Sequence, residues 1–490
     1  MMGFQGTLPV LLPHELLHTL HKTTSTLQWN LSILGRCSAR GNFGQWWAHD
    51  KTHHPHHPTQ SLPDEIRRYM IPVGLHGDEV ADVKDGKVLV ITWNSVTSRI
   101  KAWDCRFVFA VVPYREMVGR KTLFRLFEVL RWSLECAGRG VFPYRDHLGE
   151  PFVKGSPRCK LALTPLAGHW RMYFVEMRGD NEFYAWAYHW NHYRCSYICH
   201  RCQCEESGDM SWADLRRDAP CFTTLVSTAD FFANTDDASR SPLCTIPGWD
   251  LDRVVNDHMH GQNLGIDPHV CGNLLYDEVV ESGVMVKDRD AYLGEVWMEF
   301  NTWCKGKKIS GSQKKFSMRN IISTTVAKYP PLHGKAANTR VVLAFLAERI
   351  VRSTRGSRSP YLQKCATCAW ALNEYHRLCE QAGDPFSETA AAEVVKLGWL
   401  FLETYVWLRN FSSDHDDVGW HLVPKHHYFA HTLLDVSKTR MNPVYHHCYL
   451  DEDMVGRVAR GSRKVHRSTV SQRWFERYIH MMFTRWRAHV

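Results

Sequence analysis

The sequence predicts an α/β fold in which a mixed sheet is interrupted by a large helical insertion and followed by a basic helical C-terminus. Three observations support this: strand-like runs between residues 69 and 176, helical periodicity across 262–412, and a concentration of cations after 456. The 490 residues are 44% hydrophobic and 23% charged, which is typical of a folded protein and excludes disordered, collagen-like and coiled-coil classes. Its apolar runs are too short to span a bilayer, so we expect no membrane partner.

Three closely spaced runs rich in apolar and β-branched residues predict strands at Tyr69–Leu75, Lys87–Val96 and Arg106–Tyr114. Apolar residues at helical spacing then predict a helix at Thr122–Cys136, and Trp170–Glu176 predicts a fourth strand. Three strands, a helix and a fourth strand is the order of an RNase H-like core.

The rest of the chain is dominated by helical patterns. A helix at Asn181–Trp190 follows the fourth strand directly, and 205–260 is punctuated by Pro and Gly, as in loops. Further helices are predicted at Asp290–Cys304, Arg340–Arg352, Tyr361–Gln381 and Glu388–Arg409. The expected divisions are an irregular leader with a His/Pro-rich linker (1–62), the first part of the core with a CxxC (63–210), a mostly helical insertion (211–415), and the last part of the core with the basic helix (416–490).

Acidic residues follow two of the predicted strands. Asp78 comes just past the first strand and Asp180 just past the fourth, and these strands are neighbours in an RNase H-like sheet. A late helix beginning near Glu452 can supply a third carboxylate, with Asp451 or Asp453 as alternatives. Three converging carboxylates form an oxygen-rich site for two Mg²⁺ or Mn²⁺ ions, which can promote attack on a phosphodiester.

Asp257, in Asp257-His-Met-His260, is a rival for the second acid. We favour Asp180 because it follows a clear strand. Each acid taken alone is also a common turn or N-cap residue.

Cysteine and histidine pairs indicate a structural zinc site. Cys199 and Cys202 form a CxxC, which supplies two ligands and needs two more. His427 and His431 are spaced i, i+4, so both imidazoles face the same side of a helix. A zinc ion shared by the two pairs would hold the region of the third acid against the strand that precedes Asp180. The alternatives are Cys195 and Cys204 as local ligands, and His426 in place of His427.

The order of these motifs resembles eukaryotic cut-and-paste DDE transposases. Gly179-Asp180, Cys199-x-x-Cys202, a helical insertion, Pro424-Lys-x-His-x-x-x-His431 and Tyr449-Leu-Asp-Glu452 look most like the CACTA and Plavaka groups. The hAT group and the recombination-activating recombinase share this plan, and the resemblance covers about residues 65–470.

The resemblance implies a Mg²⁺-dependent nuclease and strand transferase with Asp78, Asp180 and Glu452 as its triad. It also implies DNA as partner, a homo-oligomer on DNA ends and a nuclear location. The alternative is a catalytically inactive, transposon-derived DNA-binding protein.

The last 34 residues carry most of the net charge. From Arg457 to Val490 there are nine Lys or Arg and one acid, which gives +8 of the formal +9. The candidate phosphate contacts are Arg463, Lys464, Arg467 and Arg473, and the candidate stacking aromatics are Trp474, Tyr478 and Trp486.

Two further motifs match metal sites by spacing alone. His14-Glu-Leu-Leu-His18 matches the HExxH of zinc peptidases, but no substrate-binding sheet precedes it in this sequence, so we favour a chance match over a metallopeptidase. Cys365 and Cys368 lie inside a helical pattern, which favours a place in a helix core.

Overall fold

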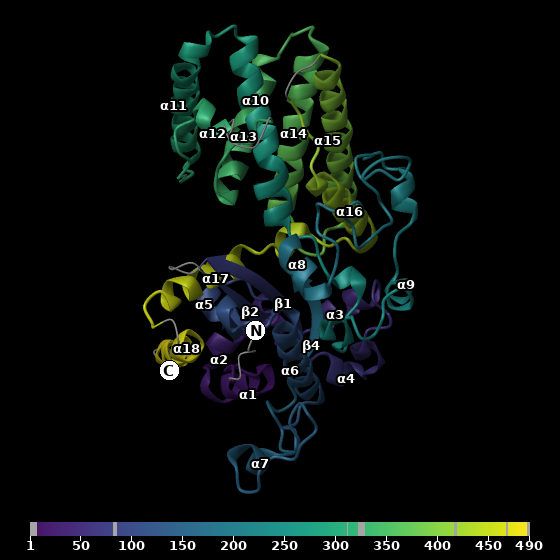
Figure 1. The fold of residues 1–490 in the computed structure, drawn as a ribbon, viewed down its shortest axis with the longest axis vertical. Helices are drawn as coiled ribbons and strands as arrows, with labels where there is room; N and C mark the ends of the chain where they lie inside the picture. Colours follow the sequence, from purple (N-terminus) through teal and green to yellow (C-terminus); the bar gives the residue numbers. More distant parts are fainter. Residues whose placement is uncertain are drawn as a thin grey trace. The chain divides into compact units, whose positions relative to one another are not determined.

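The computed structural model describes residues 7–81, 86–310, 312–321, 329–415, 419–466 and 469–487. The chain forms two compact units (Figure 1). The sheet unit consists of Met1–His192, Ser227–Val255 and Cys448–Val490, and the helical unit of Tyr193–Val226 and Asn256–His447. The helical unit therefore extends beyond the expected 211–415 and includes both the CxxC and the His427/His431 pair.

One mixed four-stranded sheet organises the sheet unit. Its strands are β1 (Met70–Ala81), β2 (Lys87–Ser95), β3 (Phe107–Pro113) and β4 (Arg171–Arg178), in the order β3-β2-β1-β4. β2 is antiparallel to both β1 and β3, whereas β4 is parallel to β1. The predicted mixed α/β class and all four predicted strands are confirmed. Continuous apolar runs of this kind form strands that are buried on both faces of a sheet.

Helices cover this sheet. α6 (Gly119–Arg139) connects β3 to β4 and buries its predicted apolar stripe, and α8 (Asn181–Tyr188) follows β4. α17 (Tyr449–Ser462) packs against β1, and α18 (Val470–Arg487) packs against β3. The short helices of this unit are α4 (Asp64–Arg67), α5 (Ala102–Cys105), α7 (Pro157–Leu161) and α9 (Thr228–Ala233).

The region expected to be an irregular leader is helical and packed. It contains α1 (Pro13–Thr23), α2 (Thr26–Trp29) and α3 (Gly44–Lys51). Trp47 is fully buried, and its indole N–H donates to the carbonyl oxygen of Met70 at 2.7 Å. These buried contacts depend on residues distant in sequence, which the irregular, partly His/Pro-rich composition of residues 1–62 does not reveal.

A buried ion pair anchors this region, and it predicts an acid-sensitive contribution to stability. Asp50 lies 2.9 Å from Arg253, and although burial raises the pKa of Asp50, Arg253 together with His54 and His57 outweighs burial and lowers it to about 2. A lowered carboxyl pKa stabilises the fold above the unfolded value of about 3.9 and loses that effect as pH falls towards 2. We expect Asp50→Asn to cost roughly 2–3 kcal/mol at pH 7 and progressively less below about pH 4. Thermal unfolding of the wild type and of Asp50→Asn from pH 7 to pH 3 measures this loss of stability. An equal destabilisation of Asp50→Asn at every pH would contradict the prediction.

The aromatic residues of the basic segment are core residues rather than stacking surfaces. Trp474, Tyr478 and Trp486 are each at most 3% exposed. The Tyr478 hydroxyl lies 3.3 Å from the amide nitrogen of Val108, which fixes α18 to β3. The expectation that these rings stack on bases is therefore wrong, because their periodicity along α18 is that of a buried helix face.

The helical unit consists of α10 (Asp267–Glu281), α11 (Arg289–Lys307), α12 (Met318–Ile321), α13 (Ala336–Ser353), α14 (Pro360–Gln381), α15 (Glu388–Asp414) and α16 (Pro424–Thr439). The four predicted helices of this region are confirmed. A π-helix (Met259–Ile266) precedes α10. Cys365 and Cys368 are buried in α14, as predicted. None of the helices that the structure describes has both the length and the hydrophobicity of a membrane span.

Candidate metal centres

The register of the two parallel strands places Asp78 beside Asp180. His76 of β1 pairs with Arg178 of β4, and each acid lies two residues further along its own chain. Neighbouring strands are about 4.8 Å apart, so the two residues occupy adjacent positions at one end of the sheet. Asp78 lies inside β1 rather than just past it, because β1 keeps pairing with β2 through Asp78 opposite Val90.

α17 brings Glu452 to the same place. The side chain of Asp78 is hydrogen-bonded to that of Glu452 and feels the negative charge of both Glu452 and Asp180. Burial first, and then these two charges, raise the pKa of Asp78 to about 8. Asp78 thus lies within electrostatic reach of two other carboxylates, and a bound cation would relieve the repulsion among them.

The neighbours of Glu452 on α17 point elsewhere. Successive helical residues are rotated by about 100°, so three consecutive acids cannot face one site. Asp451 is fully buried, with its Oδ1 atom 2.7 Å from Nε of Arg106. Asp453 is 40% exposed and lies 2.8 Å from Arg457. Of the three candidate third acids, Glu452 is therefore the one that meets Asp78.

Asp257, the rival second acid, belongs to the helical unit. Its carboxylate lies 2.6 Å from Nδ1 of His260 and accepts a bond from the backbone N–H of that residue at 2.9 Å. Asp78, Asp180 and Glu452, by contrast, all belong to the sheet unit.

Two glycines lie beside the acids: Gly179 belongs to the Gly179-Asp180 motif already noted in the sequence, whereas Gly77 was not singled out. Asp180 is the N-cap of α8 and accepts a hydrogen bond from the backbone N–H of Phe183 at 2.7 Å. The Phe183 ring lies on Gly77 and Gly179, where added Cβ atoms would come within 2.1 and 2.7 Å of it. Only glycine at these positions lets α8 start so close to β1. Gly179, which precedes Asp180, was the one residue in the sequence that indicated this close approach.

The predicted cysteine and histidine ligands form a second cluster, inside the helical unit. One ligand atom from each of Cys199, Cys202, His427 and His431 lies within 4.8 Å of the others. Sγ of Cys199 is 3.4 Å from Nε2 of His431, Sγ of Cys202 is 3.3 Å from Nε2 of His427, and the two Nε2 atoms are 3.2 Å apart. Ligands around a tetrahedral zinc ion are about 3.3–3.8 Å from one another, so this group can hold a metal ion of that size.

Surrounding contacts orient these ligands. The guanidinium of Arg201, between the two cysteines, lies 2.9 Å from Asp435 on α16, and its backbone N–H donates to Sγ of Cys199 at 3.3 Å. The ring of Phe222 stacks on His427. Such outer contacts fix ligand orientation in metal sites.

Within the cluster, the pKa of the Cys199 thiol is shifted towards the metal-binding form, whereas hydrogen bonds to Cys199 and Cys204 raise that of Cys202. Burial raises the pKa of Cys199, but hydrogen bonds from Cys202 and Cys204 and the charge of His431 outweigh burial and hold that pKa well below its usual range. Burial lowers the pKa of His427, but its interactions with Cys199 and Cys204 raise it to about 10. A thiolate is the form of cysteine that binds metal.

The alternative ligands take other places. Nδ1 of His426 lies 3.1 Å from the carbonyl oxygen of Val423, and its ring packs on Tyr405. Cys195 is exposed, whereas Cys204 is buried against the cluster.

The HExxH motif lies on α1 and its side chains have structural partners. Nδ1 of His14 is 2.8 Å from the Ser133 hydroxyl, Nδ1 of His18 is 2.5 Å from the carbonyl oxygen of Leu166, and Glu15 pairs with Arg158 at 2.7 Å. Among the residues described, the histidines of this motif belong to no group of potential metal ligands.

No protein-family model matches the chain, and no curated protein sequence matches it.

Proposed function

We propose that this protein cleaves and joins DNA by two-metal phosphodiester chemistry, as a DDE transposase does. The observation that carries the proposal is that Glu452 and Asp180 both lie close enough to Asp78 to raise its pKa, in addition to the effect of burial. The sheet order β3-β2-β1-β4, with β4 parallel to β1, supports an RNase H-like core interrupted by the helical unit.

The residues of the site bind and orient rather than form covalent bonds. Two Mg²⁺ or Mn²⁺ ions held here would activate the nucleophile and stabilise the leaving oxygen. Asp78 and Asp180 would hold both ions, and Glu452 would hold the second. Water is the nucleophile for strand cleavage, which leaves a 3′-hydroxyl, and this hydroxyl is the nucleophile for joining.

We propose a structural Zn²⁺ for the Cys199, Cys202, His427 and His431 cluster. Its donors are two sulfurs and two imidazole nitrogens, a set typical of closed structural zinc sites. The ion would fasten the CxxC segment to α16 across more than two hundred residues of sequence.

DNA is the proposed substrate, bound by the protein as a homo-oligomer in the nucleus. Of the cations expected to contact phosphate, Arg463, Lys464 and Arg473 are exposed, and Arg473 also pairs with Glu476 at 2.9 Å. Arg467 lies outside the described residues.

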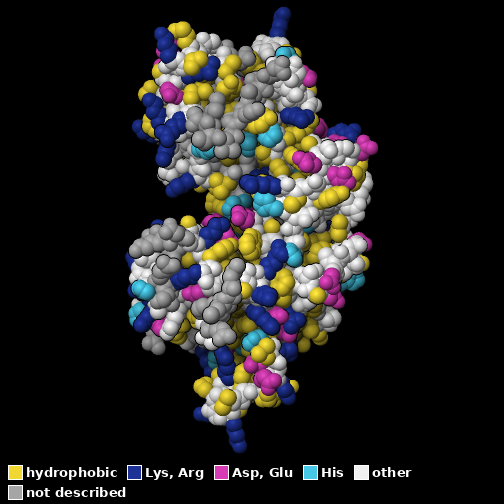
Figure 2. Space-filling model, in the orientation of Figure 1, with side chains coloured by type: hydrophobic (Ala, Val, Ile, Leu, Met, Phe, Trp, Pro, Cys, Tyr) yellow, Lys and Arg dark blue, Asp and Glu magenta, His cyan; other side chains and the backbone are white. Residues whose placement is uncertain are grey.

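A second cationic surface, which sequence reasoning overlooked, lies at the end of α11. Residues 302–321 contain no acid, and Figure 2 shows Lys and Arg side chains gathered over α11. The six exposed cations of this basic face are Lys305, Lys307, Lys308, Lys314, Lys315 and Arg319. Among the described residues only Lys307 has an ion-pair partner, Glu348 at 3.0 Å. Unpaired cations of this density suit a phosphate backbone.

We expect the triple variant Lys308→Gln/Lys314→Gln/Lys315→Gln to weaken duplex DNA binding. If all three contact phosphate, the slope of log affinity against log salt should fall by about 0.9 for each lost contact. The matched control is Lys364→Gln/Arg377→Gln/Lys396→Gln, which removes the same charge from α14 and α15. Fluorescence anisotropy over a salt series measures the DNA affinity of both variants. An equal loss of affinity in the two would show that only the net charge matters, and would contradict phosphate contacts by these three lysines.

The proposal is tested by incubating the full chain with supercoiled plasmid and Mg²⁺. We expect nicked and linear products that EDTA prevents. DNA binding without any cleavage, in Mg²⁺ or Mn²⁺, would overturn the catalytic claim and favour an inactive, transposon-derived DNA-binding protein.

A further inference from the structure

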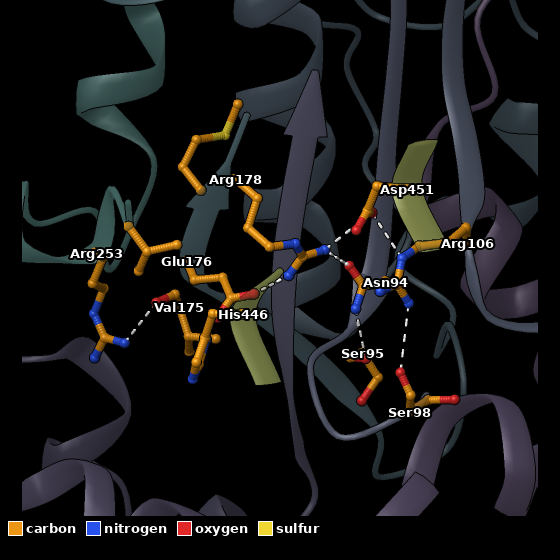
Figure 3. Close-up of polar contacts among 12 residues, drawn as sticks. Asn94, Ser95, Ser98, Arg106, Val175, Glu176, Arg178, Arg253, His446 and Asp451 are labelled. Carbon is orange, nitrogen blue, oxygen red and sulfur yellow. Dashed lines mark hydrogen bonds and ion pairs between the residues drawn. The ribbon is translucent and has the colours of Figure 1, made fainter. Parts of the chain in front are cut away.

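A network of buried charges in the sheet unit joins Arg178, Asp451 and Arg106 (Figure 3). Arg178, at the end of β4, contacts Glu176 and reaches over β1 to Asn94 on β2. Its Nη2 atom lies 3.2 Å from Oδ1 of Asp451, and the same oxygen is 2.7 Å from Nε of Arg106, just before β3. Every one of these side chains is at most 5% exposed. The network thus connects α17 to the strands on both sides of β1.

The backbone of β1 is shaped to admit this network. A Cβ atom at Gly74 would come within 2.6 Å of Nη1 of Arg178, so glycine leaves the path across the strand open. Gly74 lies opposite Asn94 on one side and Glu176 on the other, which aligns the network in one row of the sheet.

Asp451 is fully buried between two guanidinium groups, with its Oδ1 atom shared by Arg106 and Arg178. A buried ion network of this kind contributes little net stability compared with apolar packing, and its best-attested use is to fix one arrangement of elements. The arrangement fixed here is the rotation and axial position of α17 on the sheet.

That arrangement determines where Glu452 points. Glu452 directly follows Asp451, so it is rotated by about 100° and displaced by about 1.5 Å along the helix. On the other side, Arg178 precedes Asp180 by two residues, so the network also fixes the end of β4 that carries this acid.

We infer that Asp451, clamped by Arg106 and Arg178, is a positioning residue that holds Glu452 against Asp78 in metal-binding geometry. This inference rests on the proposed function, because it assumes that the three acids bind metal. Asp451 would then act on the metal site by orienting its neighbour Glu452, and not by binding metal itself.

The test is a titration of the full chain with Mn²⁺, following free Mn²⁺ by electron paramagnetic resonance, for the wild type and three variants. Asp451→Asn is expected to weaken Mn²⁺ binding by about 10–100-fold, as loss of an outer-shell partner does. The matched control is Asp50→Asn, which breaks another buried ion pair of the same unit, Asp50 with Arg253 at 2.9 Å. It should lower the unfolding temperature as well but leave Mn²⁺ affinity unchanged. Circular dichroism identifies a temperature at which the wild type and the variants are all folded, and the titrations are made at that temperature.

Glu452→Gln separates the inference from the function. If Glu452→Gln loses Mn²⁺ binding while Asp451→Asn, folded, binds as the wild type does, the positioning role is overturned and the metal site stands. If Glu452→Gln binds Mn²⁺ as the wild type does, the proposed metal site itself fails. If Asp451→Asn does not fold, Arg106→Lys is tested in its place. This variant keeps the positive charge but lacks the planar guanidinium with its fixed donor geometry. A loss of Mn²⁺ affinity in Arg106→Lys would support the inference. Unchanged affinity in folded Arg106→Lys would overturn it.

Discussion

Replacing Glu452 with Gln is expected to reduce Mg²⁺-dependent plasmid nicking by roughly a thousandfold or more, since in the proposed site it removes charge that would balance a catalytic ion. The same variant should not lower the unfolding temperature of the metal-free protein. Glu452 contributes to the raised pKa of Asp78, so its charge opposes ionisation of Asp78 in the folded state. Removing that charge relieves repulsion, which is the usual relation between active-site charge and stability.

The matched control is Asp453→Asn on the next position of α17. Asp453 is 40% exposed and pairs with Arg457 at 2.8 Å, a surface pair of small energetic value. Nicking by this variant should stay within about threefold of the wild type, because Asp453 carries no ligand role and a surface pair contributes under about 1 kcal/mol. A loss in Asp453→Asn as large as that in Glu452→Gln would show that the third acid is wrongly assigned.

Replacing Cys202 with Ser is expected to remove bound zinc and to unfold or loosen the helical unit. The Cys202 sulfur lies 3.3 Å from Nε2 of His427 in the buried cluster, and a serine hydroxyl is a poor zinc ligand. Binding of a structural zinc ion is coupled to folding, so loss of the ion costs several kcal/mol, on the order of the stability of a domain.

Cys195→Ser provides the control, because Cys195 is an exposed thiol in the same segment outside the cluster. Elemental analysis should find about one zinc ion per chain in the wild type and in Cys195→Ser, and far less in Cys202→Ser. Thermal unfolding monitored by circular dichroism should show the matching loss. A wild-type protein purified without zinc that neither binds the added metal nor gains stability from it would contradict the assignment.

Much of the sheet unit was predictable because its signals are local. β-branched and apolar runs identified all four strands, and their order with α6 predicted which strands would be neighbours. The positions of Asp78 and Asp180 follow from that order, since parallel neighbours bring equivalent ends together. The members of the Cys/His cluster were predictable from spacing, because i, i+4 histidines and a CxxC can each form half of a metal site.

The remaining features depend on contacts between distant residues. Arg106 and Asp451 are 345 positions apart, and no local pattern indicates that they meet. The choice of Glu452 over Asp451 follows from that contact and not from the run of three acids. Similarly, the burial of Trp47 and Tyr478 depends on the sheet they cover, so both regions looked more exposed in sequence than they are.

The central claim is that Asp78, Asp180 and Glu452 hold two divalent ions. Anomalous diffraction at the manganese edge, from crystals of the full chain grown with Mn²⁺, tests it most directly. We predict two peaks about 3.5–4 Å apart, with oxygens of all three carboxylates as ligands. Manganese bound elsewhere, with no peak among these three side chains, would contradict the account.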